Sequence, residues 1–438
     1  MHTLFITGPG GAGRTTVAAA TALAAARTGR RVLLLLGDQG AHPGPGNGPG
    51  PGNGPGPGNG PGSGPENGRG SGPGDLFGLF GPPDGEPAEA APGLWAVPVA
   101  GIRVARTDSG EEFRSGLVAL QEHGSALLSL AGARPLGAEE LTELPGAEQF
   151  ALLRAVRLAA AAPGTDLLVV DLPPLHQAVT TLALPAQLRR YLARLLPSER
   201  RAARALRPVL AQLAGVPMPA TWLYEAAERW DRELAAVQAV VQSPTTEVRL
   251  VAEAGPAADA ALRTGRLGLA LHELPVRALI ANRTVPRGSA DPWLAGLAAQ
   301  QQRWTEVWTE VWAGAGDVPV TGLAHLGRDP RTPADLALLA ATDGLAPAAP
   351  APRTPWAVED RRAEDGVLVW AIPLPGADKR DLDLVRRGDE LLLTAGPYRR
   401  AVPLPPALRR CTVSGAALTE GVLRVRFTPD PGLWPRTP

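Results

Sequence analysis

A glycine-rich loop between an apolar strand and a helix is the feature that most restricts how this chain folds. The apolar run at residues 2–7 leads into the loop "GPGGAGRTT" at 8–16, and an alanine-rich, helix-forming segment follows. A second apolar run, "VLLLL" at 32–36, then ends two residues before Asp38. This strand–helix–strand order predicts a parallel sheet with helices on both faces, because parallel neighbours need a crossover connection.

The loop nearly matches the pattern G-x-x-x-x-G-K-[ST], in which backbone N–H groups and a helix N-terminus surround nucleotide phosphates. Arg14 stands at the lysine position, and Thr15 stands at the hydroxyl position that holds Mg²⁺. Arginine keeps the charge but replaces a compact ammonium with a wide planar fork, so the two are not equivalent. We predict that ATP and Mg²⁺ bind here, the alternative being a glycine-rich turn that binds nothing. The predicted ATP-binding residues of the loop are Gly8, Gly10, Gly11, Ala12, Gly13, Arg14, Thr15 and Thr16.

Five further segments, like the loop, resemble segments of one known protein family. Together they resemble the ArsA family of ATPases, which includes the arsenite-pump ATPase and the ATPases that target tail-anchored membrane proteins. The resemblance covers roughly residues 1–340 and predicts a P-loop NTPase fold. The matching segments are "APGLWA" (91–96), "ELTELPG" (140–146), "DLPPLHQAVT" (171–180), "RYLARLLP" (190–197) and "ANRTVP" (281–286).

The resemblance implies roles for three residues outside the loop. Asp38 matches the family's catalytic aspartate, which orients the attacking water. Asp171 begins the segment that corresponds to the family's switch II and is implied to hold Mg²⁺ together with Thr15. Asn282 matches the asparagine that recognises adenine.

The chain departs from the family at two catalytic positions. Pro9 replaces a signature lysine that, in the family, reaches across a dimer to the partner's phosphates. The Thr-Gly-His core of switch II is replaced by Leu-His-Gln at 175–177. Because positive charge at the phosphates stabilises the transition state, these losses predict weak nucleotide binding and slow hydrolysis or none.

The C-terminal segment has a different sequence pattern, in which apolar and polar residues alternate between turns rich in glycine and aspartate. This pattern predicts a small all-β sandwich. The runs at 372–396 and 421–427 resemble the small heat-shock (α-crystallin-like) domain, which implies a chaperone-like interaction role; the alternative is a sandwich that only packs on its neighbour. The predicted organisation is an ATPase domain at 1–345 with a disordered Gly/Pro insertion at 43–74, a linker at 346–355 and the sandwich at 356–438.

Composition excludes several classes of function. The 43 basic and 43 acidic residues balance, which gives no support for binding nucleic acid. One cysteine, Cys411, predicts neither a zinc clamp nor an arsenite site, since both need several thiolates. No apolar run reaches transmembrane length and no signal peptide precedes the first strand, so we expect a cytoplasmic protein. The tryptophan stripe at 304, 308 and 312 is expected to pack in the core.

Two functional hypotheses remain open at this point. In the first, the chain is an ArsA-like, ATP-binding homodimer, or pairs with a related ArsA-like partner, and couples nucleotide state to a client protein or a membrane partner. In the second, the ATPase fold is an inactive scaffold and the crystallin-like domain acts as a chaperone. Pro9 and Arg14 favour the second, whereas Asp38, Thr15 and Asn282 favour the first.

Overall fold

The computed structural model describes residues 1–37, 79–80, 83–92, 94–107, 144–196, 221–313, 318–353 and 355–434. Asp38 and the predicted insertion at 43–74 lie outside these described residues. The same is true of residues 140–143, which begin one of the segments that resemble the ArsA family.

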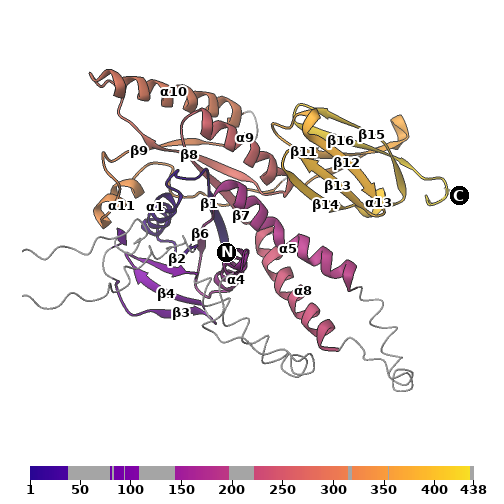
Figure 1. The fold of residues 1–438 in the computed structure, drawn as a ribbon, viewed down its shortest axis with the longest axis horizontal. Coiled ribbons are helices and arrows are strands. Elements are labelled where there is room, and N and C mark those ends of the chain that lie inside the picture. The colour runs from indigo at the N-terminus through magenta and orange to yellow at the C-terminus, as the bar shows by residue number, and fades with distance from the viewer. Residues whose placement is uncertain are drawn as a thin grey trace, which may run out of the picture.

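The N-terminal part of the chain forms a nine-stranded sheet in the order β3-β4-β5-β2-β6-β1-β7-β8-β9 (Figure 1). The seven strands from β5 to β9 in this order run parallel, and β3 and β4 add an antiparallel edge. The predicted α/β fold with a parallel sheet is therefore confirmed. The strands are β1 (His2–Thr7), β2 (Val32–Leu36), β3 (Ala88–Ala91), β4 (Leu94–Val99), β5 (Ile102–Arg106), β6 (Leu167–Asp171), β7 (Thr246–Glu253), β8 (Val276–Thr284) and β9 (Val320–Ala324).

Helices cover both faces of this sheet, because successive side chains of its central strands point to opposite sides and both sets are apolar. In β2, Leu33 and Leu35 belong to one buried cluster, and Leu34 belongs to the other. Helices α1 and α11 cover the second face, and the remaining helices cover the first. The helices are α1 (Arg14–Arg27), α4 (Ala147–Ala160), α5 (Leu175–Leu195), α8 (Thr221–Val241), α9 (Pro256–Leu271), α10 (Pro292–Ala313) and α11 (Pro333–Ala340).

The C-terminal part is an all-β unit of a four-stranded and a three-stranded antiparallel sheet, in the orders β10-β11-β16-β15 and β12-β13-β14. This confirms the predicted sandwich. Alternation explains it: Leu391, Leu393 and Ala395 of β13 are fully buried, and the residues between them are not. The elements are β10 (Ala357–Arg361), α12 (Arg362–Asp365), β11 (Val367–Pro373), η2 (Lys379–Asp381), β12 (Leu382–Arg387), β13 (Glu390–Ala395), β14 (Tyr398–Pro403), α13 (Pro406–Arg409), β15 (Cys411–Thr419) and β16 (Val422–Pro429).

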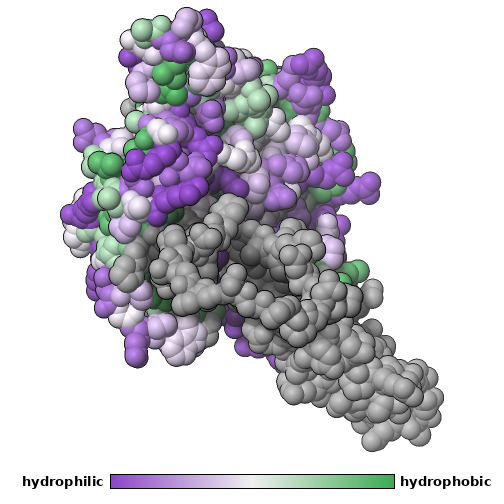
Figure 2. Space-filling view, turned by 60° about the vertical axis from the view of Figure 1, so that its left-hand side comes forward, coloured by the Kyte–Doolittle hydropathy of each residue, from purple (hydrophilic) through white to green (hydrophobic). Residues whose placement is uncertain are grey.

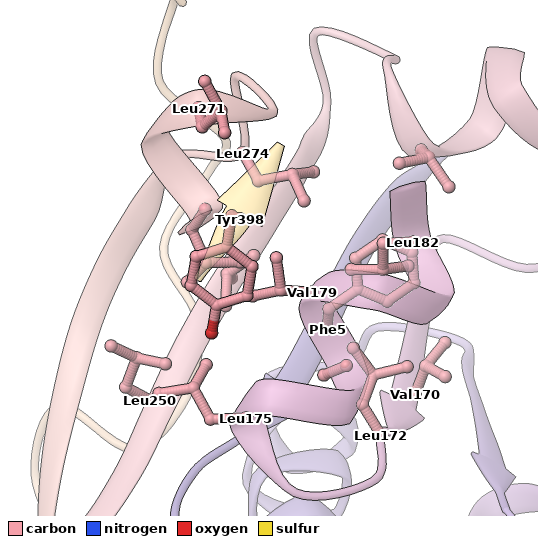
Figure 3. Packing of buried hydrophobic residues seen from close by; sticks show 14 of the residues in the cluster. Phe5, Val170, Leu172, Leu175, Val179, Leu182, Leu250, Leu271, Leu274 and Tyr398 are labelled. Carbon is pink, nitrogen blue, oxygen red and sulfur yellow. The ribbon is translucent and has the colours of Figure 1, made fainter. Parts of the chain in front are cut away.

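The sandwich packs against α5 and α9, at the side of the sheet away from α1 (Figure 1). Tyr398 of β14 is 3% exposed and lies in one apolar cluster with Leu175 of α5 and Leu271 of α9 (Figure 3). Two glycines of α9 make this approach possible. A Cβ atom at Gly268 would lie 2.6 Å from the Tyr398 ring, and one at Gly265 would lie 2.2 Å from Leu175.

Ion pairs flank this apolar contact. Arg190 and Arg194 of α5 both bind the Glu390 carboxylate of β13, and the Arg190 guanidinium lies 3.0 Å from it. Arg400 of β14 donates to the carbonyl of Leu271 (2.7 Å) and pairs with Glu273 (2.8 Å). The sandwich is therefore held by both apolar and charged contacts, and each involves α5 or the end of α9.

The face of the molecule drawn in Figure 2 is mixed rather than broadly apolar. In Figure 2, hydrophilic residues in purple are interspersed with isolated hydrophobic ones in green. Within the described ranges, we find no helix that combines the length and apolar character needed to span a bilayer. The tryptophan stripe packs as expected, with Trp308 and Trp312 of α10 buried.

Replacing Gly268 with alanine tests the contact between α9 and Tyr398. The added methyl group would overlap the Tyr398 ring, so we expect a loss of about 1–3 kcal/mol in the free energy of unfolding. Gly296→Ala on α10 is the matched control, because nothing lies within 4 Å of its added Cβ. There the higher helix propensity of alanine should stabilise by up to about 1 kcal/mol. Equal stabilisation of both variants in thermal melts would contradict the packing described here.

Candidate functional site

The loop after β1 wraps the N-terminus of α1 and leaves it accessible. Gly11 and Gly13 adopt left-handed backbone angles (φ 77° and 79°), and Gly13 is the residue before the helix begins. Since Gly13 has no side chain, it cannot cap the first-turn N–H groups of α1. Gly10 and Gly11 are exposed, and a Cβ atom on either would meet nothing within 4 Å. The residues present therefore fit the phosphates of a nucleotide, which bind bare backbone N–H groups at a helix N-terminus.

The closed side of the loop is packed against the strands on either side of β1. A Cβ atom at Gly8 would lie 1.8 Å from the carbonyl oxygen of Val251 in β7. The Gly8 carbonyl accepts a hydrogen bond from the Leu175 amide (2.9 Å), and the Thr7 hydroxyl donates to the Pro173 carbonyl (2.8 Å). The loop is thus bonded to the segment that follows β6, which corresponds to switch II.

Arg14 makes a further contact with that segment. Its guanidinium donates to the backbone carbonyl of Leu172. Burial lowers the pKa of Arg14, and the nearby negative charge of Asp171 opposes this shift. The arginine stays charged, and its fork is directed at the end of β6.

Asp171 lies at the end of β6, next to β1, and Thr15 lies at the start of α1. Asp171 is fully buried at the carboxyl end of β6 and pairs in register with Ile6 of β1, whereas Thr15 is half-buried in the first turn of α1. A carboxylate and a hydroxyl are oxygen donors of the kind that Mg²⁺ prefers. Their role as magnesium ligands remains a prediction. Within the described ranges, no three His, Cys, Asp or Glu side chains form a group that could hold a metal by themselves.

Asn282 lies at the end of β8 and contacts the loop directly. Its side-chain amide donates to the carbonyl of Ala12 (2.8 Å), and the side chain is buried. The next residue, Arg283, donates to the carbonyl of Gly11 (3.0 Å) from a backbone with φ of 56°. Sequence reasoning did not single out Arg283; the signal available was an arginine directly after the matched asparagine.

A small cavity lies beside Asn282, between Thr16 of α1 and the segment that contains His325 and Arg328. Its volume is about 30 Å³, which is the volume that one water molecule occupies in the liquid. An adenine ring is far larger than this cavity. The prediction that Asn282 recognises adenine stays a prediction. For Asp38, the structure describes only the preceding strand, which ends at Leu36 beside Asp171.

Comparison with known proteins identifies the fold around this loop. A family model described as anion-transporting ATPase (ArsA) matches residues 1–42 and 102–320, more than half of the chain. The chain belongs to the ArsA ATPase family. A second model, an HSP20-like domain found in ArsA proteins, matches residues 365–427, which cover most of the sandwich.

Relatives match along the whole length of this ArsA-family chain. An uncharacterized protein of Streptomyces coelicolor is 53% identical over 437 residues, covering 100% of both chains. A protein of Mycobacterium tuberculosis is 32% identical, covering 99% of this chain and 97% of its own. A protein of Aquifex aeolicus with the provisional name arsenical pump-driving ATPase 1 is 23% identical, covering 93% and 95%. The pairing of an ATPase-like part with an HSP20-like part is therefore not peculiar to this chain.

Two glycines of the loop offer a sharp test of this geometry. Gly8→Ala places a methyl group inside a backbone carbonyl contact, so we expect a loss of about 3 kcal/mol or more in the free energy of unfolding. Gly10→Ala is the matched control two residues away, with open space around its Cβ, and should change stability by less than about 0.5 kcal/mol. Chemical denaturation measures both. A Gly8→Ala variant as stable as Gly10→Ala would show that the loop does not lie against β7.

Proposed function

We propose that this ArsA-family protein binds ATP with Mg²⁺ weakly, hydrolyses it slowly, and couples the nucleotide state to the handling of a client protein or a membrane partner. The observation that carries the proposal is the accessible N-terminus of α1 inside a glycine loop that is bonded to the switch II segment. Such a loop has the backbone donors that phosphates need.

The coupling route runs through the five residues that follow β6. Leu172 and Leu175 contact the loop through backbone atoms, and the Pro173 carbonyl contacts Thr7 directly before the loop. On the other side, the Leu175 side chain packs at Gly265 of α9, and the His176 ring lies 5.7 Å from the Tyr398 ring of the sandwich. A change of the loop on nucleotide binding would therefore act on a segment that also contacts the crystallin-like domain.

Each predicted residue has a role in this proposal. Backbone N–H groups of the loop hold the phosphates, Thr15 and Asp171 hold Mg²⁺, Asp38 orients water and Asn282 contacts adenine. When bound, Mg²⁺ would supply charge neutralisation at the phosphates. Turnover is slow in this account because Pro9 and Arg14 replace both lysines of the family loop. The protein acts in the cytoplasm, as a homodimer or with a related ArsA-like partner.

One observation favours an alternative, in which the ATPase part is an inactive scaffold for the crystallin-like domain. One guanidinium nitrogen of Arg14 donates to the Leu172 carbonyl, so this donor is engaged by the protein itself. If Arg14 keeps this hydrogen bond to Leu172 when ATP is added, its positive charge is not available to the phosphates.

Calorimetric titration with ATP and Mg²⁺ tests binding on the wild type and on Arg14→Lys. A compact ammonium fits between the β- and γ-phosphates where the fork does not, so we expect Arg14→Lys to bind about tenfold more tightly. Arg27→Lys, at the other end of α1, is the control and should bind as the wild type does. Equal affinities for all three proteins would show that Arg14 has no part in binding.

A phosphate-release assay on the same proteins separates the two functions. The proposed function predicts slow release by the wild type that disappears in an Asp38→Asn variant. The scaffold alternative predicts no release above background in any variant, with or without measurable binding. Release that Asp38→Asn leaves unchanged would overturn the assigned role of Asp38.

A further inference from the structure

A large cleft separates the helices α5 and α8 from strands β13 and β14 of the sandwich. The residues at the end of α9, the start of β8 and the segment around Arg353 form its floor. The cleft has a volume of about 1,710 Å³. Pockets for small ligands usually measure about 300–1,000 Å³, so this cleft is larger than a small molecule requires.

Positive charge is concentrated in the cleft, although the net charge of the whole chain is zero. Among the described residues, nine arginines and four carboxylates line it, which leaves an excess of five positive charges. The pKa of His272 in the floor is lowered to about 3 by burial and by the charge of Arg400, so His272 is neutral and adds nothing to this excess.

Several of these arginines have no carboxylate partner. Arg266 is buried and stacks on Trp312, with its guanidinium carbon 4.3 Å from the ring centroid. Arg353 donates to three backbone carbonyls instead of a carboxylate. In the part of the chain that the structure describes, Arg232 and Arg399 at the rim are exposed and form no ion pair. Arg190 and Arg194 share one carboxylate, Glu390.

Aromatic rings lie between the charges. Trp356 and Trp370 pack edge to face with centroids 5.8 Å apart, and Arg400 lies over Trp356 at 5.1 Å. Trp370 is 3% exposed, and its indole N–H has no hydrogen-bond partner among the described residues. Arginine and tryptophan together are typical of surfaces that bind proteins.

We propose that this cleft binds an acidic, extended segment of a partner protein. Spaced arginines with apolar surface between them complement a polypeptide in which carboxylates alternate with apolar residues. A nucleic acid fits less well, because Asp231, Glu273 and Glu390 would face its continuous line of phosphates. The cleft needs no nucleotide for this contact, so its test is separate from that of ATP binding.

Fluorescence anisotropy with the full-length protein tests the proposal. The probe is a labelled peptide of about a dozen residues that alternates glutamate with leucine and alanine. We expect it to bind about tenfold more tightly than the same peptide with glutamine for glutamate, with an affinity that falls as salt is added. Equal binding of the two peptides would overturn the proposal.

Charge reversal at the rim locates the binding. Arg232→Glu with Arg399→Glu should weaken binding of the acidic peptide about tenfold, because both side chains are exposed in the cleft and unpaired. Arg303→Glu with Arg424→Glu is the matched control, since these exposed arginines lie outside the cleft. The milder pair Arg232→Gln with Arg399→Gln should weaken binding in the same direction if the reversal impairs folding.

Two results would contradict this location. If the control pair weakens binding as much as the rim pair, the peptide responds to overall charge and not to the cleft. If a single-stranded oligonucleotide displaces the peptide and loses its own affinity with the rim pair, the cleft is a nucleic-acid site instead.

Discussion

The hydrogen bond from the Leu175 amide to the Gly8 carbonyl joins the glycine loop to the segment after β6, the two parts on which the proposed function depends. On the other side of the loop, the backbone at Gly8 lies so close to β7 that no side chain fits there. The same hydrogen bond holds Leu175 at the start of α5, where that residue packs against Gly265 and near Tyr398. The glycine loop, the segment that resembles switch II and the sandwich are consequently in contact in series.

This chain differs from the family pattern at the two loop positions where the family has lysines. The glycines that shape the loop backbone are present. Pro9 and Arg14 change the side chains of the loop, whereas the left-handed Gly11 and Gly13 preserve its path around α1. Because phosphate binding depends largely on backbone donors and hydrolysis depends on added charge, binding is expected to survive better than turnover. This difference gives the proposed function its form: weak binding that changes conformation, with slow hydrolysis.

Local pattern predicted the elements and could not predict how they touch. The βαβ unit and the alternating strands of the sandwich are each indicated by a short stretch of sequence. The sequence therefore predicted β1, α1, β2 and β13. Strands β3 and β5 at the antiparallel edge were not predicted in this way. The Arg14–Leu172 and Asn282–Ala12 contacts join residues separated by 158 and 270 positions, and no local pattern encodes them. The sequence around Gly268 likewise gives no sign that a glycine is needed there. The structure explains it, because the Tyr398 ring of the sandwich leaves no room for a side chain at this position.

Hydrogen–deuterium exchange tests most directly whether the nucleotide loop and the sandwich are coupled. Exchange is compared with and without ATP and Mg²⁺, at concentrations that calorimetry shows to saturate the site, in peptides covering residues 8–16, 172–180 and 396–403. The account predicts that protection changes in all three regions, because the switch II segment contacts both the loop and Tyr398. Protection that changes in the loop alone, with 172–180 and 396–403 unaffected, would contradict it.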